Sequence, residues 1–209
     1  MGCLRLLLAT SLAVAGALPS WSWDTIQNYV HCANTTGEWN AGALATLASK
    51  PFVVFEKNHK LTQAPVSDDA EGKIAASCAE VKKLSPTTDC YMYVESDVAR
   101  SFYGLGHWVE ANKATAALKC NGSYVTQTWS EEGLDFTFYA YDFRDATMQA
   151  KWVARVADAV EAGTVDGAFI DGDRNGFWSS VTNGCAKDEQ DAWAAGLNAS
   201  VAALAATIG

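Results

Sequence analysis

The chain has 209 residues, which is enough for one domain of ordinary size and hardly for two. Hydrophobic residues make up 49% and charged residues 19% of the chain, a globular balance. The 24 acidic residues outnumber the 15 basic ones and give a net charge of −9. This charge disfavours a nucleic-acid partner and adhesion to an anionic membrane. Because there are only three histidines, a multi-histidine metal centre is not expected, and we expect no cofactor.

The first 17 residues have the pattern of a secretory signal peptide. Arg5 precedes an apolar run over 6–15, and Ala15-Gly16-Ala17 offers small residues for cleavage. The run is shorter than the roughly 18 residues that a membrane span needs. An uncleaved N-terminal anchor is the less favoured alternative. We therefore expect a secreted, extracellular protein whose residues 18–209 form one domain without membrane association.

The cysteines fit an oxidising compartment. Removal of residues 1–17 leaves five cysteines, which allows at most two disulfides and one remaining thiol. Spacing does not fix the pairing, but Cys78–Cys90 is favoured because a helix end and the next strand start meet at one end of a βα unit. Three glycosylation sequons agree with secretion and begin at Asn34, Asn121 and Asn198.

The rest of the chain alternates strand and helix patterns. Apolar runs of strand length cover 51–56, 90–95, 137–142 and 165–171. Helices are predicted after the caps Ser67-Asp68 and Ser96-Asp97, and over 145–162 and 187–206. Between them, a hairpin is expected around Asn121-Gly122.

This alternation predicts an α/β fold with a parallel sheet. The strands are apolar nearly throughout, which is typical of a sheet covered on both faces. No glycine-rich phosphate motif follows the first strand, so a dinucleotide-binding fold lacks its signature.

Each predicted strand ends in a carboxylate. These residues are Glu56, Glu95, Asp142 and Asp171. Acidic residues after strands also cap helices, which is the simpler explanation for any one of them. Four in succession, with tyrosines nearby, favour a carbohydrate cleft, because carboxylates act on glycosidic bonds and aromatic faces stack on sugar rings.

Two motifs resemble a known family. They are Tyr141-Asp142-Phe143-Arg144-Asp145, followed by Trp152, and Val165-Asp166-Gly167-Ala168-Phe169-Ile170-Asp171-Gly172. These motifs are similar to those of glycoside hydrolase-like TIM-barrel proteins, the hypothetical glycosidases related to the endo-polygalactosaminidases. The segments at 55–58 and 91–95 look like earlier strands of that family. The resemblance covers residues 38–207.

The resemblance implies roles for particular residues. Asp171 is the first candidate for a catalytic carboxylate, followed by Asp142 and Glu95. One carboxyl group would act as general acid and another as base or nucleophile, and the sequence does not assign these roles. The candidates for contact with the carbohydrate substrate are Glu56, Lys57, Tyr93, Tyr141 and Trp178.

The resemblance also implies a (β/α) barrel of TIM type, and the strand count makes it a partial one. A full barrel has eight strands and typically about 250 residues, against four strands here. The chain could represent a truncated gene model, a half-barrel that forms an oligomer, or a degenerate relative. A non-catalytic carbohydrate-binding protein or an inactive truncated relative is therefore the alternative to a glycosidase.

Two other patterns were weighed. Residues 171–176 match the first half of a calcium-binding EF-hand loop, but Thr182 stands where the loop needs a bidentate glutamate. Among the histidines, only His59 is expected near the cleft, because it follows the first predicted strand.

Overall fold

The computed structural model describes residues 28–62, 69–131, 133–172 and 184–208. The predicted signal peptide at 1–17, Trp178 and most of the calcium-loop pattern lie outside these residues. Among the helices that are described, none combines the length and apolarity that crossing a membrane requires.

A four-stranded parallel sheet organises the fold. Its order is β1 (Val30–Cys32), β2 (Phe52–Phe55), β3 (Asp89–Glu95) and β9 (Gly167–Asp171). Three of the predicted strands are therefore confirmed as members of a parallel sheet. Over the described ranges the sheet is open, with β1 and β9 at its edges, so a closed barrel stays a prediction.

The prediction that 137–142 forms a parallel strand is wrong. This segment belongs to β8 (Leu134–Ala140), which pairs antiparallel with β7 (Thr126–Glu131) and with β4 (Val98–Ala99) in a separate sheet. The side chains of β8 alternate between exposed and less exposed positions. This alternation is typical of an antiparallel strand with one face toward solvent. The fourth strand of the parallel sheet is β1, which pairs with β2 at the edge opposite β9 and was not predicted.

The helices begin at caps that differ by a few residues from those predicted. The N-cap of α2 (Ala70–Leu84) is Asp69, not Ser67-Asp68, and α3 (Gly104–Ala111) starts after Tyr103, not after Ser96-Asp97. Asp145 caps α5 (Ala146–Glu161) by accepting a hydrogen bond from Met148 N. The other helices are α1 (Ala41–Ala48), α4 (Lys113–Ala116) and α7 (Lys187–Ile208).

The expected hairpin at Asn121-Gly122 is confirmed. It joins β5 (Lys119–Cys120) to β6 (Ser123–Tyr124), and Cys120 pairs with Ser123. Both turn residues have positive φ, at 52° for Asn121 and 79° for Gly122, as a type I′ turn requires.

The two faces of the parallel sheet differ. One face, with Phe55, Cys90 and Met92, is buried in the hydrophobic core. The other face carries aromatic rings, and among these Phe169 remains 37% exposed and Tyr29 49% exposed. Phe169 contacts His31 and Tyr93 on this face. The expectation of equal cover on both faces therefore does not hold over the described residues.

Two disulfides tie the layers together. Cys78 on α2 bonds to Cys90 on β3, which confirms the favoured pairing, and Cys120 on β5 bonds to Cys185 just before α7. Cys32 is the one free cysteine of the described part, as the count of five predicted. Burial raises the pKa of the Cys32 thiol to about 11, so the thiol stays protonated and unreactive.

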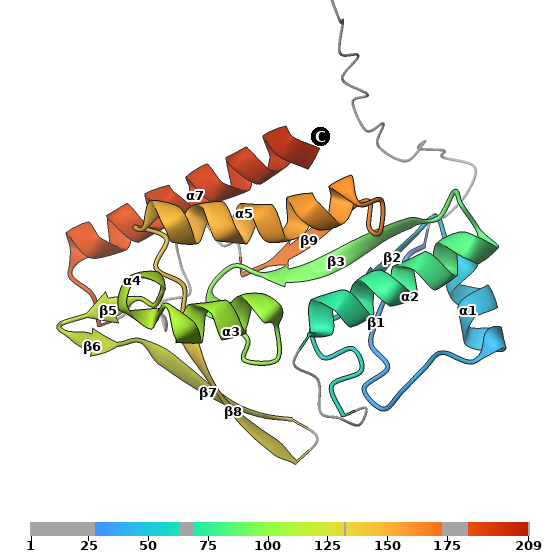
Figure 1. Cartoon of the computed structure of the whole chain (residues 1–209), viewed down its shortest axis with the longest axis horizontal. Coiled ribbons are helices and arrows are strands. Elements are labelled where there is room, and N and C mark those ends of the chain that lie inside the picture. The colour runs from blue at the N-terminus through green and yellow to red at the C-terminus, as the bar shows by residue number, and fades with distance from the viewer. Residues whose placement is uncertain (1–27, 63–68, 132, 173–183, 209) are drawn as a thin grey trace, which may run out of the picture.

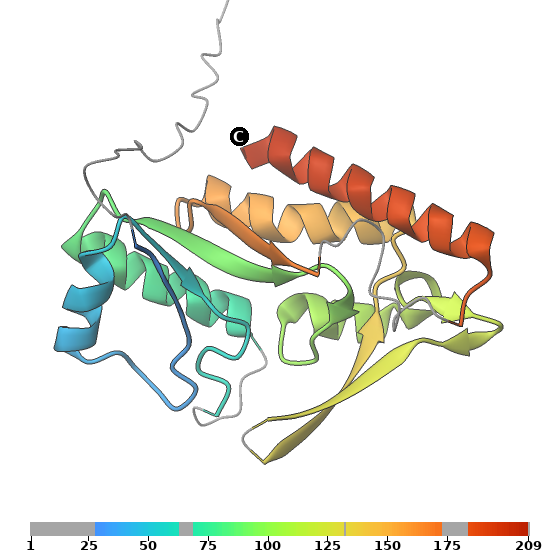
Figure 2. The same cartoon turned by 180° about the vertical axis from the view of Figure 1, so that it is seen from behind.

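Figure 1 shows how the elements are arranged. α5 and α7 lie side by side, and α1 and α2 lie together against the strands at the opposite end of the molecule. In Figure 2, β3 and β9 point the same way and end close to the segment that leads into α3. The carboxyl ends of the parallel strands therefore meet near the middle of the molecule.

Candidate functional site

Three of the predicted carboxylates lie at the carboxyl edge of the parallel sheet. Glu56 follows β2, Glu95 ends β3 and Asp171 ends β9. Glu95 and Asp171 are direct register partners, so their side chains leave the sheet on the same face. The Ser96 hydroxyl donates to Asp171 O at 2.8 Å and keeps the two strands paired beyond this point.

The hydroxyl of Tyr93 joins these carboxylates. It hydrogen-bonds to Asp171 Oδ2 and lies 3.3 Å from Glu95 Oε2. Burial, followed by the negative charges of Glu95 and Asp171, raises the pKa of Tyr93 far above its usual value. The hydroxyl therefore keeps its proton. It can donate a hydrogen bond to either carboxylate.

Glu95 is buried and held by an arginine. Arg100 donates from Nε to Glu95 Oε2 at 3.0 Å and from Nη2 to Glu95 Oε1 at 2.8 Å, a bidentate pair. The guanidinium also lies over the rings of Phe138 and Trp129, with centroids 4.7 Å and 5.2 Å away. Asp171 is exposed, so it is the member of the pair that solvent and a ligand can reach.

A further buried carboxyl group, Asp97, lies next to Glu95. It is 1% exposed, and its Oδ1 atom has no hydrogen-bond partner. Burial and the neighbouring charge of Glu95 raise the pKa of Asp97 to about 7, against the opposing effect of Arg100. The site thus contains a carboxyl group that is poised to titrate near neutral pH.

A second polar group borders the site around Glu56. Lys57 Nζ lies 3.1 Å from Glu56 Oε2, 3.4 Å from the Tyr93 hydroxyl and 4.6 Å from the centre of the Tyr93 ring. His31 Nε2 lies 3.4 Å from Glu56 Oε1. The predicted substrate contacts Glu56, Lys57 and Tyr93 are therefore brought together beside Asp171.

Two other predicted site residues have different partners. Asp142 forms a bidentate pair with Arg144, with both donor distances at 2.8 Å, and Arg144 also bonds to Glu189. Tyr141 is 1% exposed and its carbonyl accepts a hydrogen bond from Trp193 Nε1 on α7. These contacts give both residues a role in holding β8 against α7.

The expected placement of His59 near the cleft is wrong. His59 is fully buried, its Nδ1 atom accepts a hydrogen bond from Asn34 N, and its Nε2 atom lies 2.8 Å from Ser77 Oγ. Burial lowers the pKa of His59 to about 4, so the ring is neutral. The histidine at the sheet edge is His31, on a three-residue strand too short to show a periodic pattern.

The sequence reasoning also missed Arg100 and Asp97. A signal for them existed, because both are charged residues within the mostly apolar stretch that follows the second predicted strand. The sequence pattern predicts a helix cap at Asp97. The structure instead places it in the turn between β3 and β4.

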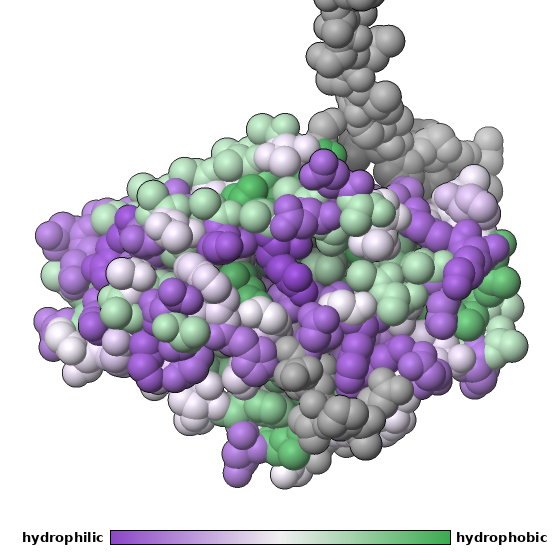
Figure 3. Space-filling model, viewed as in Figure 1, coloured by the Kyte–Doolittle hydropathy of each residue, from purple (hydrophilic) through white to green (hydrophobic). Residues whose placement is uncertain are grey.

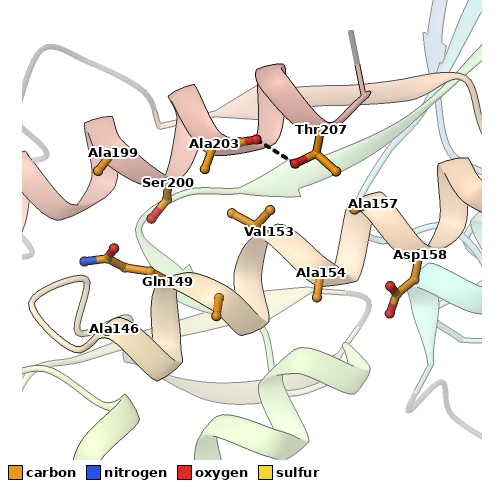
Figure 4. Close-up of a pocket in the computed structure, with 11 residues that line it drawn as sticks. Ala146, Gln149, Val153, Ala154, Ala157, Asp158, Ala199, Ser200, Ala203 and Thr207 are labelled. Carbon is orange, nitrogen blue, oxygen red and sulfur yellow. Dashed lines mark hydrogen bonds between the residues drawn. The ribbon is translucent and has the colours of Figure 1, made fainter. Parts of the chain in front are cut away.

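The molecule also has a groove between α5 and α7 (Figure 4), away from the carboxylates. It is lined mainly by alanines, and its hydroxyl groups are engaged by their own helix: Thr207 donates to Ala203 O and Ser200 to Gly196 O. On the face shown in Figure 3, hydrophobic residues are scattered among hydrophilic ones and form no single large patch. The carboxyl edge of the sheet is therefore the better candidate site.

Comparisons with known proteins give the following. No family model matches the chain, and no curated protein matches it. The chain is similar to the solved glycoside hydrolase domain of PelA from Pseudomonas aeruginosa, with 14% sequence identity and a TM-score of 0.49, over 84% of this chain and 53% of that one. It is also similar to a xylosidase from Aspergillus niger, with 14% identity and a TM-score of 0.42, over 69% of this chain and 20% of that one. This chain thus spans about half the length of the PelA domain.

Proposed function

We propose that the protein is a secreted glycoside hydrolase that acts on O-glycosidic bonds of a polysaccharide. The observation that carries the proposal is the carboxylate pair Glu95 and Asp171, which are register partners linked by the Tyr93 hydroxyl. Glycosidic bond cleavage commonly uses two carboxyl groups close together, one as acid or base and the other as nucleophile or as stabiliser of positive charge on the sugar. Neighbouring strands are about 4.8 Å apart, which brings two such groups within reach of one sugar ring.

In this proposal the exposed and the buried carboxylate have different tasks. Asp171 contacts the glycosidic bond, because it is the exposed member of the pair. Glu95 is kept ionised by the two N–H groups of Arg100 and stabilises positive charge that develops on the sugar. Lys57 and Glu56 line the same edge and bind sugar hydroxyls.

The remaining predicted residues keep narrower proposed roles. We assign a structural role to the Asp142 carboxylate instead of a catalytic one. It binds Arg144, which in turn binds Glu189. Tyr141 is assigned to packing between β8 and α7. The carbohydrate partner and secretion of the mature chain are part of the proposal and rest on the sequence.

The proposal is tested by reducing-sugar release from polysaccharides of galactosamine, glucosamine and hexoses. We expect Asp171→Asn to lower release by at least about 100-fold, the size of effect typical of a lost acid or base, with binding to the polysaccharide retained. Asp158→Asn is the matched control, because Asp158 is an exposed carboxylate on α5 that lines the groove between α5 and α7. Equal release by the wild type and Asp171→Asn would contradict the assignment.

A non-catalytic carbohydrate-binding protein is the second candidate. It is favoured by the engagement of both Glu95 oxygens by Arg100, together with the burial of Glu95. Binding of the same polysaccharides without any sugar release, by protein shown to be folded, would select this second function.

A further inference from the structure

The most unusual polar group of the described residues is Asp97. Its side chain is almost completely buried, and its Oδ1 atom has no hydrogen-bond partner. Leaving a buried carboxylate oxygen without a donor costs much more than leaving a neutral carboxyl oxygen without one. The environment therefore favours the neutral form of this group.

The position of Asp97 beside Glu95 leads to the same conclusion. An ionised carboxylate can only accept hydrogen bonds, so two neighbouring buried carboxyl groups interact favourably only when one of them holds a proton. Glu95 receives an N–H group of Arg100 on each of its oxygens, which favours its ionised form. The proton therefore belongs on Asp97.

The other groups around Asp97 do not change this balance. Arg100 supplies one positive charge, and it is already engaged by Glu95. Tyr93 on β3 and Tyr141 after β8 are neutral, because burial raises the pKa of both well above the usual value. Asp171 at the end of β9 bonds to the Tyr93 hydroxyl, and Lys57 Nζ lies 3.4 Å from the same hydroxyl, so the outer side of the site carries groups of both signs.

We propose that Asp97 is a positioning residue that keeps its proton in the folded protein and uses it to donate a hydrogen bond to Glu95. Glu95 then carries the negative charge and stays fixed between Arg100 and Asp97, with its Oε2 atom toward the Tyr93 hydroxyl. The effect on turnover rests on the proposed glycosidase function, whereas the protonation of Asp97 does not. Loss of the proton at higher pH would place two repelling carboxylates in a buried site and disturb Glu95.

The protonation is tested by carbon-13 NMR of the full protein labelled at aspartate carboxyl carbons. We expect one resonance to titrate close to pH 7, the pKa to which burial raises Asp97, and to be missing in Asp97→Asn. In Glu95→Gln the same resonance should titrate at lower pH, since the neighbouring charge is removed. A spectrum in which every aspartate titrates below about pH 5, the ordinary range of exposed carboxyls, would overturn the proposal.

A second measurement uses stability and needs no substrate. Between pH 4 and 7 an unfolded Asp97 is ionised while the folded one keeps its proton, so the contribution of Asp97 to stability should fall as pH rises through this window. Asp97→Asn has no titrating group at this position. The difference between its melting temperature and that of the wild type should therefore increase from pH 4 to pH 7 and stay constant above pH 7. A constant difference across this range would contradict the proposal.

If sugar release is found, its pH profile completes the test. The wild type should lose activity above neutral pH. Asp97→Asn keeps a hydrogen-bond donor to Glu95 at every pH, so its activity should not fall above neutral pH. Asp97→Ala removes the donor and should lower activity at every pH. Absence of sugar release would count against the glycosidase function alone, because the NMR and stability results stand without it. If the activity of Asp97→Asn falls above neutral pH in the same way as that of the wild type, the positioning role is contradicted.

Discussion

At the scale of single residues, Gly106 shows how closely the turn after β4 approaches α3. A Cβ atom at Gly106 would lie 1.8 Å from the carbonyl oxygen of Arg100, which is closer than any real contact. Only glycine allows the backbone of α3 to pack there. The position therefore fixes Arg100, which in turn holds Glu95.

We expect Gly106→Ala to destabilise the fold by about 1–3 kcal/mol, the range typical of substitutions that overpack a buried site. Gly42→Ala on α1 is the control: its nearest neighbour would be 3.4 Å away, and alanine should stabilise that helix by roughly 0.5–1 kcal/mol. Urea unfolding measures the free energy of unfolding of both variants and the wild type. A Gly106→Ala protein as stable as the wild type would show that the turn after β4 shifts to accept the methyl group without cost.

His59 gives a pH dependence opposite to that of Asp97. Because burial lowers the pKa of His59 to about 4, the unfolded chain binds a proton below pH 6.5 and the folded chain does not. The contribution of His59 to stability should therefore fall as pH falls from 6.5 to 4, by up to about 1.4 kcal/mol per pH unit. His59→Gln should lack this contribution. Urea unfolding at pH 5 and pH 7 tests it, and identical pH slopes of the two proteins would refute it.

At the scale of the elements, Glu71 connects three helices. It lies on α2, accepts hydrogen bonds from Gly104 N and Leu105 N at the start of α3, and pairs with Arg155 of α5 at 2.9 Å. Glu71 is 1% exposed, so its charge is stabilised by these partners and by the favourable end of the α3 dipole. This one carboxylate sets the position of α3 relative to α2 and α5.

We expect Glu71→Ala to cost about 1–3 kcal/mol, since it leaves two N–H groups at the start of α3 without their acceptor and leaves Arg155 with Asp69 as its remaining carboxylate partner. Glu110→Ala, which removes an exposed pair with Lys113 on α3 itself, should cost less than about 1 kcal/mol. Thermal and urea unfolding compare the two. A Glu71→Ala protein as stable as the Glu110→Ala protein would show that the carboxylate does not join the helices.

The elements also show what a sequence can predict. β3 and β9 were predicted because each is a long apolar run that ends in a carboxylate, and α5 because its buried residues recur at helical spacing. β1 has only three residues and α1 is rich in alanine and glycine, so neither has a distinctive pattern. β8 was assigned to the wrong sheet because its neighbour in the sequence, β7, is mostly polar and has no apolar run that marks it as a strand.

The same reasoning explains the result for the site. Strand-end carboxylates on the parallel sheet could be predicted, because the carboxyl ends of parallel strands share an edge. The link through Tyr93, and the burial of Glu95 under Arg100, depend on side-chain geometry that spacing does not encode. Asp142 was expected at the same edge only because β8 was taken as a parallel strand.

At the scale of the whole molecule, the two disulfides constrain the unfolded chain to different extents. Cys78–Cys90 spans 12 residues and Cys120–Cys185 spans 65. In the chain-entropy model, loops of these lengths correspond to about 3 and about 4 kcal/mol. We expect the Cys120→Ala/Cys185→Ala protein to be less stable than the Cys78→Ala/Cys90→Ala protein, as measured by urea unfolding. The reverse order would show that the buried contacts of Cys78 and Cys90 outweigh loop length.

The longer disulfide has a further consequence for protein that has been cut by a protease. The ring it closes runs from 120 to 185 and includes β8, α5 and β9, and hence Asp171, whereas Glu95 lies outside it. A single cut of the backbone inside the ring would leave both pieces covalently joined. Such nicked molecules should migrate as one band in electrophoresis without reductant and as two bands with it. Asp171 would stay attached to the strand that carries Glu95 until the disulfide is reduced.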